Sequence, residues 1–294
     1  MEKKPFIFIL LFFFVVNKSW AADYYEVRDS LKKENSNHIA LCSEQGNKGC
    51  QLMLGFAYLY GSEFKDSRSP KNIDRAVEVL AESTMLPYSR FLLGKIYLDS
   101  QEKNHMGITL IQSACEENIE EACAISAEQY SSRNGCDKSY EFFDCKYDID
   151  KAIKYEEKTV YLYNRKLGNR ALDKNRILLI KINILKYNIK LGEMLIINND
   201  ARGVSLLESI NLDELDFDIL TLARVYEEGK IVPQDLIKAY MYYDLTGGSE
   251  EDKARLAKKM TSAQMKEAAE RSWNWQEQHH SYRPGYRTPA DYDF

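Results

Sequence analysis

The sequence predicts an all-α fold, built as a right-handed superhelical solenoid of helix–turn–helix repeats with local disulfides. Apolar residues recur at three- and four-residue steps, while glycine (14 of 294 residues) and proline (6) are sparse. A motif with leucine, a small residue and then tyrosine occurs three times, as LGFAYLYG (54–61), LGKIYLDS (93–100) and LARVYEEG (222–229). Two cysteine pairs share one spacing, which places the same covalent link at equivalent points of a repeat.

Helix boundaries follow from the same periodicity and from prolines and glycines. Pro70 and Pro233 stand before apolar periodic runs, where a first helical turn tolerates proline. Gly61, Gly229 and the pair 247–248 stand where helices should end, in the left-handed conformation. We expect helices at 24–43, 49–60, 72–84, 88–99, 104–117, 119–132, 148–166, 170–195, 201–210, 214–228, 234–246, 250–258 and 262–279.

The run ILLIKINILKYNI (177–189) alternates in places, as a strand would. Its length without glycine or proline favours a helix. The apolar face of that helix is expected to comprise Leu178, Ile182, Leu185 and Ile189. In the repeat motif, Gly55 and Gly94 are expected to let paired helices approach closely.

The six cysteines form three close pairs along the chain. Cys42 and Cys50 are eight residues apart, as are Cys115 and Cys123, while Cys136 and Cys145 are nine apart. Zinc sites prefer a C-x2-4-C spacing and four converging ligands, which this pattern lacks. We therefore predict three local disulfides, formed in an oxidising compartment, and no metal site.

The N-terminus has the composition of a secretory signal peptide. Lys3 and Lys4 precede an uncharged apolar run, and Ser19-Trp20-Ala21 offers a cleavage site, with Ala22 as a near alternative. Eleven apolar residues are too few to span a bilayer about 30 Å thick. We expect cleavage near Ala21, no membrane span, and a periplasmic or secreted product.

Charge argues against one class of partner. Removal of residues 1–21 takes away three lysines and one glutamate, so the formal net charge moves from −5 to −7. A net acidic chain without a long basic run is a poor nucleic-acid binder. We expect no nucleic-acid partner.

The stretch LARVYEEGKIVPQDLIKAYMYYDLTGG (222–248) resembles the Sel-one-like repeat (SLR) family, a branch of the tetratricopeptide-like solenoids. The matching positions are Tyr226, Gly229, Pro233, Asp235, Lys238, Ala239, Tyr242 and Tyr243. The resemblance is strong over 40–130 and 215–275 and weak over 135–212, where we expect irregular or lengthened repeats. The cysteine spacing is similar to that of the cysteine-rich secreted bacterial subgroup, where a cysteine late in one repeat bonds one early in the next.

The resemblance implies a concave surface that binds an extended segment of another protein. It also implies a more specific role as an immunity or inhibitor protein, because SLR proteins with signal peptides occur beside secreted lipase toxins. The alternative is enzymatic, since the cysteine-rich subgroup is associated with penicillin binding and weak β-lactam hydrolysis.

The sequence itself offers no set of catalytic residues and implies no cofactor. Ser30-Leu31-Lys32-Lys33 matches the S-x-x-K pattern of penicillin-recognising enzymes, but the companion S-D-N and K-T-G motifs are absent. His279-His280, with Asp291 and Asp293, could chelate a metal, but a solvated tail explains them more simply.

Aromatic residues outside the repeat motif give the candidate partner-binding site. Phe142 and Phe143 lie inside the loop that a Cys136–Cys145 bond would close, with Tyr140 beside them and Tyr147 after them. Aromatic anchors dominate interface energetics, although the same rings could equally fold back onto the solenoid. We expect the solenoid to cover 22–280 and residues 281–294 to form a flexible tail.

Overall fold

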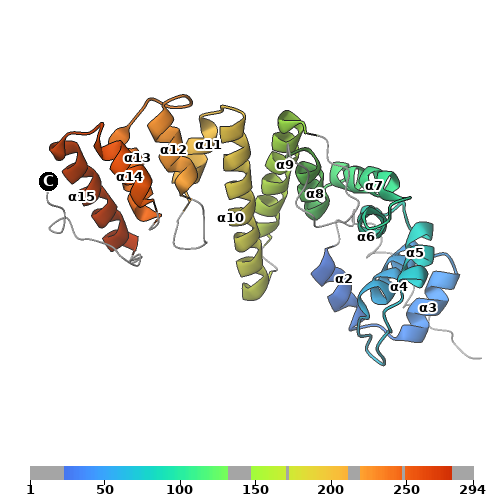
Figure 1. Ribbon diagram of the computed structural model, residues 1–294. Coiled ribbons are helices and arrows are strands. Elements are labelled where there is room, and N and C mark those ends of the chain that lie inside the picture. Colours follow the sequence, from blue (N-terminus) through green and yellow to red (C-terminus); the bar gives the residue numbers. More distant parts are fainter. Residues whose placement is uncertain (1–22, 132–146, 170–171, 211–218, 247–248, 280–294) are drawn as a thin grey trace, which may run out of the picture. The chain divides into compact units, whose positions relative to one another are not determined.

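The computed structural model describes residues 23–131, 147–169, 172–210, 219–246 and 249–279 (Figure 1). Within those ranges it contains fourteen helices and a single isolated β-bridge, between Glu63 and Arg68. The chain divides into two compact units, Met1–Leu172 and Asp173–Phe294. The expected signal peptide (1–21) and tail (281–294) lie outside the described residues and remain predictions, as does the handedness of a superhelix.

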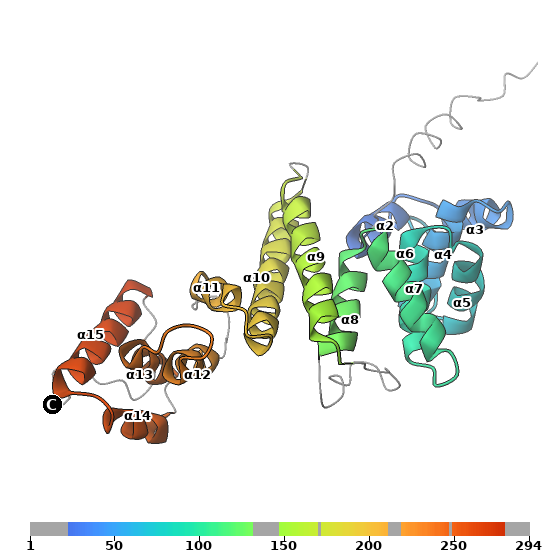
Figure 2. The ribbon, with the colours of Figure 1, turned by 90° about the horizontal axis from the view of Figure 1, so that it is seen from above.

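The first unit consists of consecutive helix pairs. Its helices are α2 (Tyr24–Leu31), α3 (Ser36–Glu44), α4 (Lys48–Tyr60), α5 (Ile73–Glu82), α6 (Pro87–Leu98), α7 (Asn104–Glu116), α8 (Glu120–Ser131) and α9 (Ile149–Leu167). Helices α4 and α5, α6 and α7, and α8 and α9 pack as neighbours (Figure 2). Fully buried apolar side chains such as Phe56, Leu80 and Leu92 fill the space between the helices.

Two disulfides link neighbouring helices of the first unit across a turn. Cys42 on α3 bonds Cys50 on α4, and Cys115 on α7 bonds Cys123 on α8. The second bond spans the turn between two helix pairs, as the resemblance implied, and the first joins α3 to the pair formed by α4 and α5. The third predicted pair, Cys136 and Cys145, lies outside the described residues.

The second unit continues the pairing without cysteines. Its helices are α10 (Lys174–Ile197), α11 (Arg202–Glu208), α12 (Leu220–Glu228), α13 (Leu236–Leu245), α14 (Glu250–Ala257) and α15 (Ser262–His279). Asp244 links α13 to two other helices. It forms an ion pair with Lys253 of α14 at 2.9 Å and accepts a hydrogen bond from Ser272 of α15 at 2.7 Å. No described helix is both long and apolar enough to cross a membrane.

Glycines mark the closest helix contacts in both units. A Cβ on Gly55 would lie 2.6 Å from Leu80 Cγ, and one on Gly94 would lie 3.0 Å from Ile111 Cγ1. Both distances are too short for an unperturbed contact, so the register predicted for these glycines is confirmed. In the region of weak resemblance, Leu191-Gly192 repeats the leucine and glycine of the motif with Leu195 at the tyrosine position, and a Cβ on Gly192 would lie 2.6 Å from Leu207 Cγ.

One predicted helix, 24–43, was wrong as a single element. It divides into α2 and α3 at Lys32–Asn35. The long loop after α4 stabilises this break, since the backbone N–H of Lys65 donates to Glu34 O at 2.9 Å and Asp66 Oδ1 accepts from the backbone N–H of Ser36 at 2.9 Å. These contacts lie about thirty positions away in sequence, beyond the reach of a local periodicity argument.

Helix ends give a mixed outcome. Gly61 and Gly229 end α4 and α12 with φ of 64° and 65°, as predicted for left-handed caps. Pro70 precedes α5, as predicted, with Asn72 as the cap, whereas α13 begins at Leu236 after its cap Asp235, so Pro233 lies in the preceding turn instead of opening the helix. Gly247 and Gly248 lie outside the described residues.

The apolar face predicted for 177–189 was also wrong in its first half. Leu178 and Ile182 are 58% and 45% exposed on α10. The buried residues of the helix are instead Ile180, Tyr187, Leu191, Gly192, Met194 and Leu195. Apolar residues occur on more than one face of this helix, so their spacing alone did not identify the buried one.

Candidate functional site

Most of the predicted partner-binding site cannot be placed. Tyr140, Phe142 and Phe143 lie outside the described residues, together with the Cys136–Cys145 pair. Tyr147 is described, and its side chain is 39% exposed just before α9. The aromatic site therefore stays a prediction.

The structure does show how the ends of the segment 132–146 are held. The backbone N–H of Asp148 donates to Tyr130 O at 2.9 Å, which joins the end of α8 to the start of α9. The rings of Tyr130 and Tyr155 stack with centroids 6.0 Å apart, and Lys151 lies 5.2 Å from the Tyr130 centroid. We refer to these contacts as the clasp.

Of the two weaker motif matches, only the S-x-x-K pattern lies wholly within the described residues. The hydroxyl of Ser30 donates to Glu26 O at 2.7 Å within α2, so its proton is directed to a backbone oxygen. His280, Asp291 and Asp293 lie outside the described residues. In the part of the chain that is described, no cluster of three or more His, Cys, Asp or Glu side chains could hold a metal ion.

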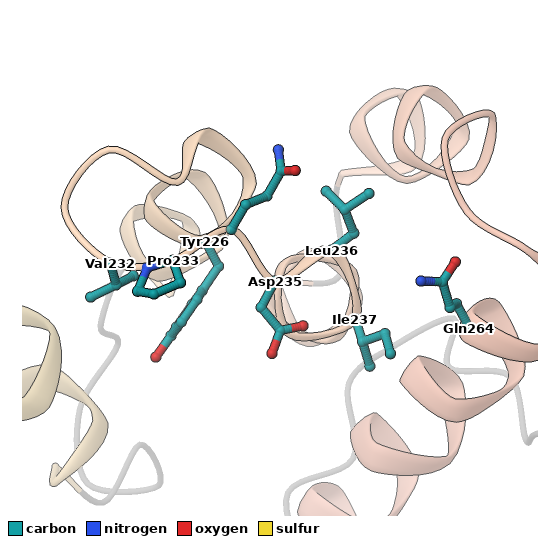
Figure 3. A pocket seen from close by; sticks show the side chains of 8 residues that line it. Tyr226, Val232, Pro233, Asp235, Leu236, Ile237 and Gln264 are labelled. Atoms are coloured by element: carbon teal, nitrogen blue, oxygen red, sulfur yellow. The ribbon is translucent and has the colours of Figure 1, made fainter.

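A groove of about 650 Å³ opens on the second unit where α12, α13 and α15 meet (Figure 3). The turn after α12 supplies Val232 and Pro233, the first turn of α13 supplies Leu236 and Ile237, and α15 supplies Gln264. Tyr226, Gln234 and Asp235 complete the lining. The lining is about half apolar and half polar, so it combines apolar contact area with groups that can orient a bound chain, as binding sites do.

Backbone constraints fix the shape of this groove. Gly229 adopts the left-handed conformation that ends α12, and a Cβ there would lie 2.7 Å from Gln234 Cβ. Asp235 then caps α13 by accepting from the backbone N–H of Lys238 at 2.9 Å. At the other wall, Thr261 and Gln264 exchange backbone and side-chain hydrogen bonds in a capping box at the start of α15.

A polar network lies beside the groove and reaches it through Tyr226. Glu208 Oε1 accepts hydrogen bonds from Tyr226 at 2.7 Å, Lys238 at 3.0 Å and Tyr242 at 3.1 Å. Lys238 also lies 4.5 Å from the Tyr226 ring centroid, close enough for a cation–π contact. One carboxylate therefore ties α11, α12 and α13 together and holds the Tyr226 ring.

The hydrogen bonds of the network keep Glu208 and Lys238 charged at neutral pH. Burial raises the pKa of Glu208, but the hydrogen bonds from Tyr226 and Lys238 outweigh it, so the pKa is lowered overall. Burial lowers the pKa of Lys238, but the hydrogen bonds to Tyr226 and Glu208 outweigh burial, so the pKa is raised overall. Burial followed by the charge of Glu208 raises the pKa of Tyr242. The Glu208–Lys238 pair is thus an intact ion pair.

Sequence reasoning identified Tyr226, Pro233, Asp235, Lys238 and Tyr242 as motif positions but did not predict a groove. The signal was present in the run IVPQDLI (231–237), which places apolar residues on both sides of a turn. Gln264 comes from a helix thirty residues farther along the chain, and only the fold brings it to the site.

Comparison with known proteins gives structural neighbours alone. No protein-family model matches the chain, and no curated protein matches it. Its solved neighbours include SLR proteins. One is c5321, described as a protective antigen of uropathogenic Escherichia coli with an SLR fold (15% identity, TM-score 0.36, covering 83% of this chain and 56% of that one). Another is a Sel1 repeat protein from Oxalobacter formigenes (15% identity, TM-score 0.37, 87% and 92%).

The chain thus spans little more than half the length of the first of these neighbours. The assignment of the fold rests on the chain's own paired helices, disulfide-linked turns and glycine contacts.

Proposed function

We propose that this protein is a protein–protein interaction scaffold outside the cytoplasm, and that the groove on its second unit binds an extended segment of a partner protein. The groove itself carries this proposal. Its apolar side chains lie on the short turn after α12 and on the capped start of α13, so little conformational entropy is lost when a partner binds. The two local disulfides support an oxidising compartment.

A narrower version is inhibition of a secreted toxin such as a lipase effector, as an immunity protein. The acidic net charge and the aromatic segment 140–147 are compatible with it. Co-expression of the chain with toxins encoded beside it tests this version, since an immunity protein restores growth.

The groove is tested by filling it. Both Gln264→Trp and Gln264→Ala remove the side-chain half of the capping box, and only Gln264→Trp also places a large ring between the walls of the groove. We expect the Trp variant to weaken binding of a periplasmic partner at least tenfold, about 1.4 kcal/mol, and the Ala variant to bind normally. Pull-down followed by titration of the identified partner measures both. Equal binding by the two variants would contradict the assignment to the groove.

The same titration tests the aromatic segment. Phe142→Ser with Phe143→Ser should weaken binding at least tenfold with melting unchanged if those rings are anchors, as the sequence predicts. Loss of the fold would instead assign the rings to the core. Normal binding by this double variant, with loss in Gln264→Trp, leaves the groove as the site.

The enzymatic alternative has no residue set to support it, because the Ser30 hydroxyl donates within its own helix. We expect purified protein to leave nitrocefin unhydrolysed. Turnover that disappears in Ser30→Ala would overturn the assignment as a scaffold.

A further inference from the structure

Asp235 lines the groove and uses only one of its two carboxylate oxygens to hold the fold. Its Oδ1 caps α13 by accepting from the backbone N–H of Lys238 at 2.9 Å. Asp235 is half-buried, and its other oxygen, Oδ2, accepts no hydrogen bond and forms no ion pair with a described residue. Figure 3 shows the carboxylate pointing to the same side as the Tyr226 ring and Ile237. One anionic oxygen can therefore bind a group that enters the groove.

Among the described residues that line the groove, Asp235 alone is charged at neutral pH. Tyr226 is neutral, because burial raises the pKa of its hydroxyl above the usual 10. The remaining lining residues are apolar side chains or neutral amides, namely Val232, Pro233, Gln234, Leu236, Ile237 and Gln264. The lining thus combines apolar surface with a single negative charge.

The two lysines that flank Asp235 along the chain do not neutralise it. Lys230 pairs with Glu228 at 2.9 Å, and Lys238 pairs with Glu208 at 3.0 Å. Both lysines are therefore committed to other carboxylates. A carboxylate attracts an opposite charge more strongly where apolar side chains exclude water. The lining is accordingly complementary to a cation brought by a partner.

We propose that the groove selects an extended segment in which an arginine or lysine side chain stands between two aliphatic side chains. The inference rests on the proposed function and adds the chemistry of the bound segment. The cation pairs with Asp235 Oδ2, and the aliphatic side chains pack on Pro233 and Ile237. In an extended chain, alternate side chains point to the same side and lie about 7 Å apart. The expected order is therefore aliphatic residue, any residue, cation, any residue, aliphatic residue.

The test uses two libraries of end-capped, fluorescently labelled peptides with this order of residues. One library carries arginine at the central position, and the other carries citrulline, which has nearly the same shape but no charge. Fluorescence anisotropy measures their binding to the oxidised mature protein. We expect the arginine peptides to bind about tenfold more tightly than their citrulline counterparts, because they add one charge pair among apolar side chains.

The variant Asp235→Asn separates the charge from the fold. Asparagine caps a helix as well as aspartate does, so melting should be unchanged while the preference for arginine is lost. Asp235→Ser, which also retains a capping oxygen, takes its place if Asp235→Asn does not fold. Glu251→Gln is the matched control, because it removes one negative charge from an exposed residue of α14. The preference for arginine should persist in that variant.

Two results would overturn the inference. One is that the wild-type protein binds the arginine and citrulline peptides equally, or binds neither, and the other is a preference for arginine that persists in Asp235→Asn. The proposed function is decided separately by the pull-down with Gln264→Trp. Peptides that bind regardless of charge, and whose binding is lost in Gln264→Trp, would leave the groove as a binding site and overturn only the choice of a cation.

Discussion

In the first unit, disulfides span two of the turns between neighbouring helices, whereas in the second unit carboxylates link the helices through hydrogen bonds and ion pairs. All six cysteines lie between residues 42 and 145, and none follows residue 172. At the corresponding junctions of the second unit, Glu208 links α11 to α12 and α13, and Asp244 links α13 to α14 and α15. The glycine contact between paired helices is common to both units. The comparison shows that the same pairing of helices at glycine contacts can be stabilised either by disulfide bonds or by ion pairs and hydrogen bonds.

The largest effect should come from removing the covalent links. Changing Cys42, Cys50, Cys115 and Cys123 to Ala opens two loops of about nine residues, each contributing about 2–3 kcal/mol to the free energy of unfolding. Hydrogen exchange on the whole chain should show lost protection in α3–α8 and unchanged protection in α12–α15. Equal loss in both units would show that they unfold together.

Overfilling a glycine contact should have the next largest effect and should act on both units alike. Gly55→Trp, Gly94→Trp and Gly192→Trp each force a side chain into a neighbouring helix, which typically costs about 1–3 kcal/mol, occasionally more. Thermal melting measures the loss. Gly168→Trp is the control, because a Cβ there meets only Arg165 O at an ordinary 3.4 Å. Unchanged melting in the first three variants would contradict the close-contact register.

Low pH should destabilise the second unit, with a smaller effect than the substitutions above. Hydrogen bonds from Arg255, then burial in the opposite sense, leave the pKa of Glu227 below its usual 4.5, and Tyr243 donates to the same carboxylate at 2.8 Å. A depressed pKa gives stability that is present above pH 4.5 and is lost as pH falls through the folded value. We expect protection of α12–α14 to fall below pH 4 and to fall less in Glu227→Gln, where the acid dependence that remains comes from Glu208.

The stability of the first unit should not fall with decreasing pH between pH 7 and 5. Burial raises the pKa of Glu121 on α8 from 4.5 to about 7. Protonation of Glu121 below pH 7 removes the free-energy cost of burying its charged form. Helix α8 should therefore not lose protection between pH 7 and 5. A fall in α8 protection over that range would contradict the environment assigned to Glu121.

Much of the fold could be predicted because its signals are local. Spacing, glycine caps and cysteine pairs located nearly every described helix and both described disulfides. The misses have long-range causes: the break before α3 depends on Asp66, and the buried face of α10 depends on its contact with α11. The groove and the buried charge were harder, since Glu121 looks like one more surface glutamate in EENIEE (116–121) until the fold encloses it. Likewise, no local pattern connects Gln264 with Pro233.

The clasp between Tyr130 and Asp148 has an evolutionary consequence. Its contacts keep the ends of α8 and α9 together regardless of what the intervening residues 132–146 encode. Each doubling of the length of a flexible loop raises its closure free energy by only about 0.6 kcal/mol, because the closure entropy grows logarithmically with length. Natural variation or grafted sequence can therefore enter at this point without disturbing the neighbouring helices. The turn between α8 and α9 is therefore suited to insertion or replacement of sequence.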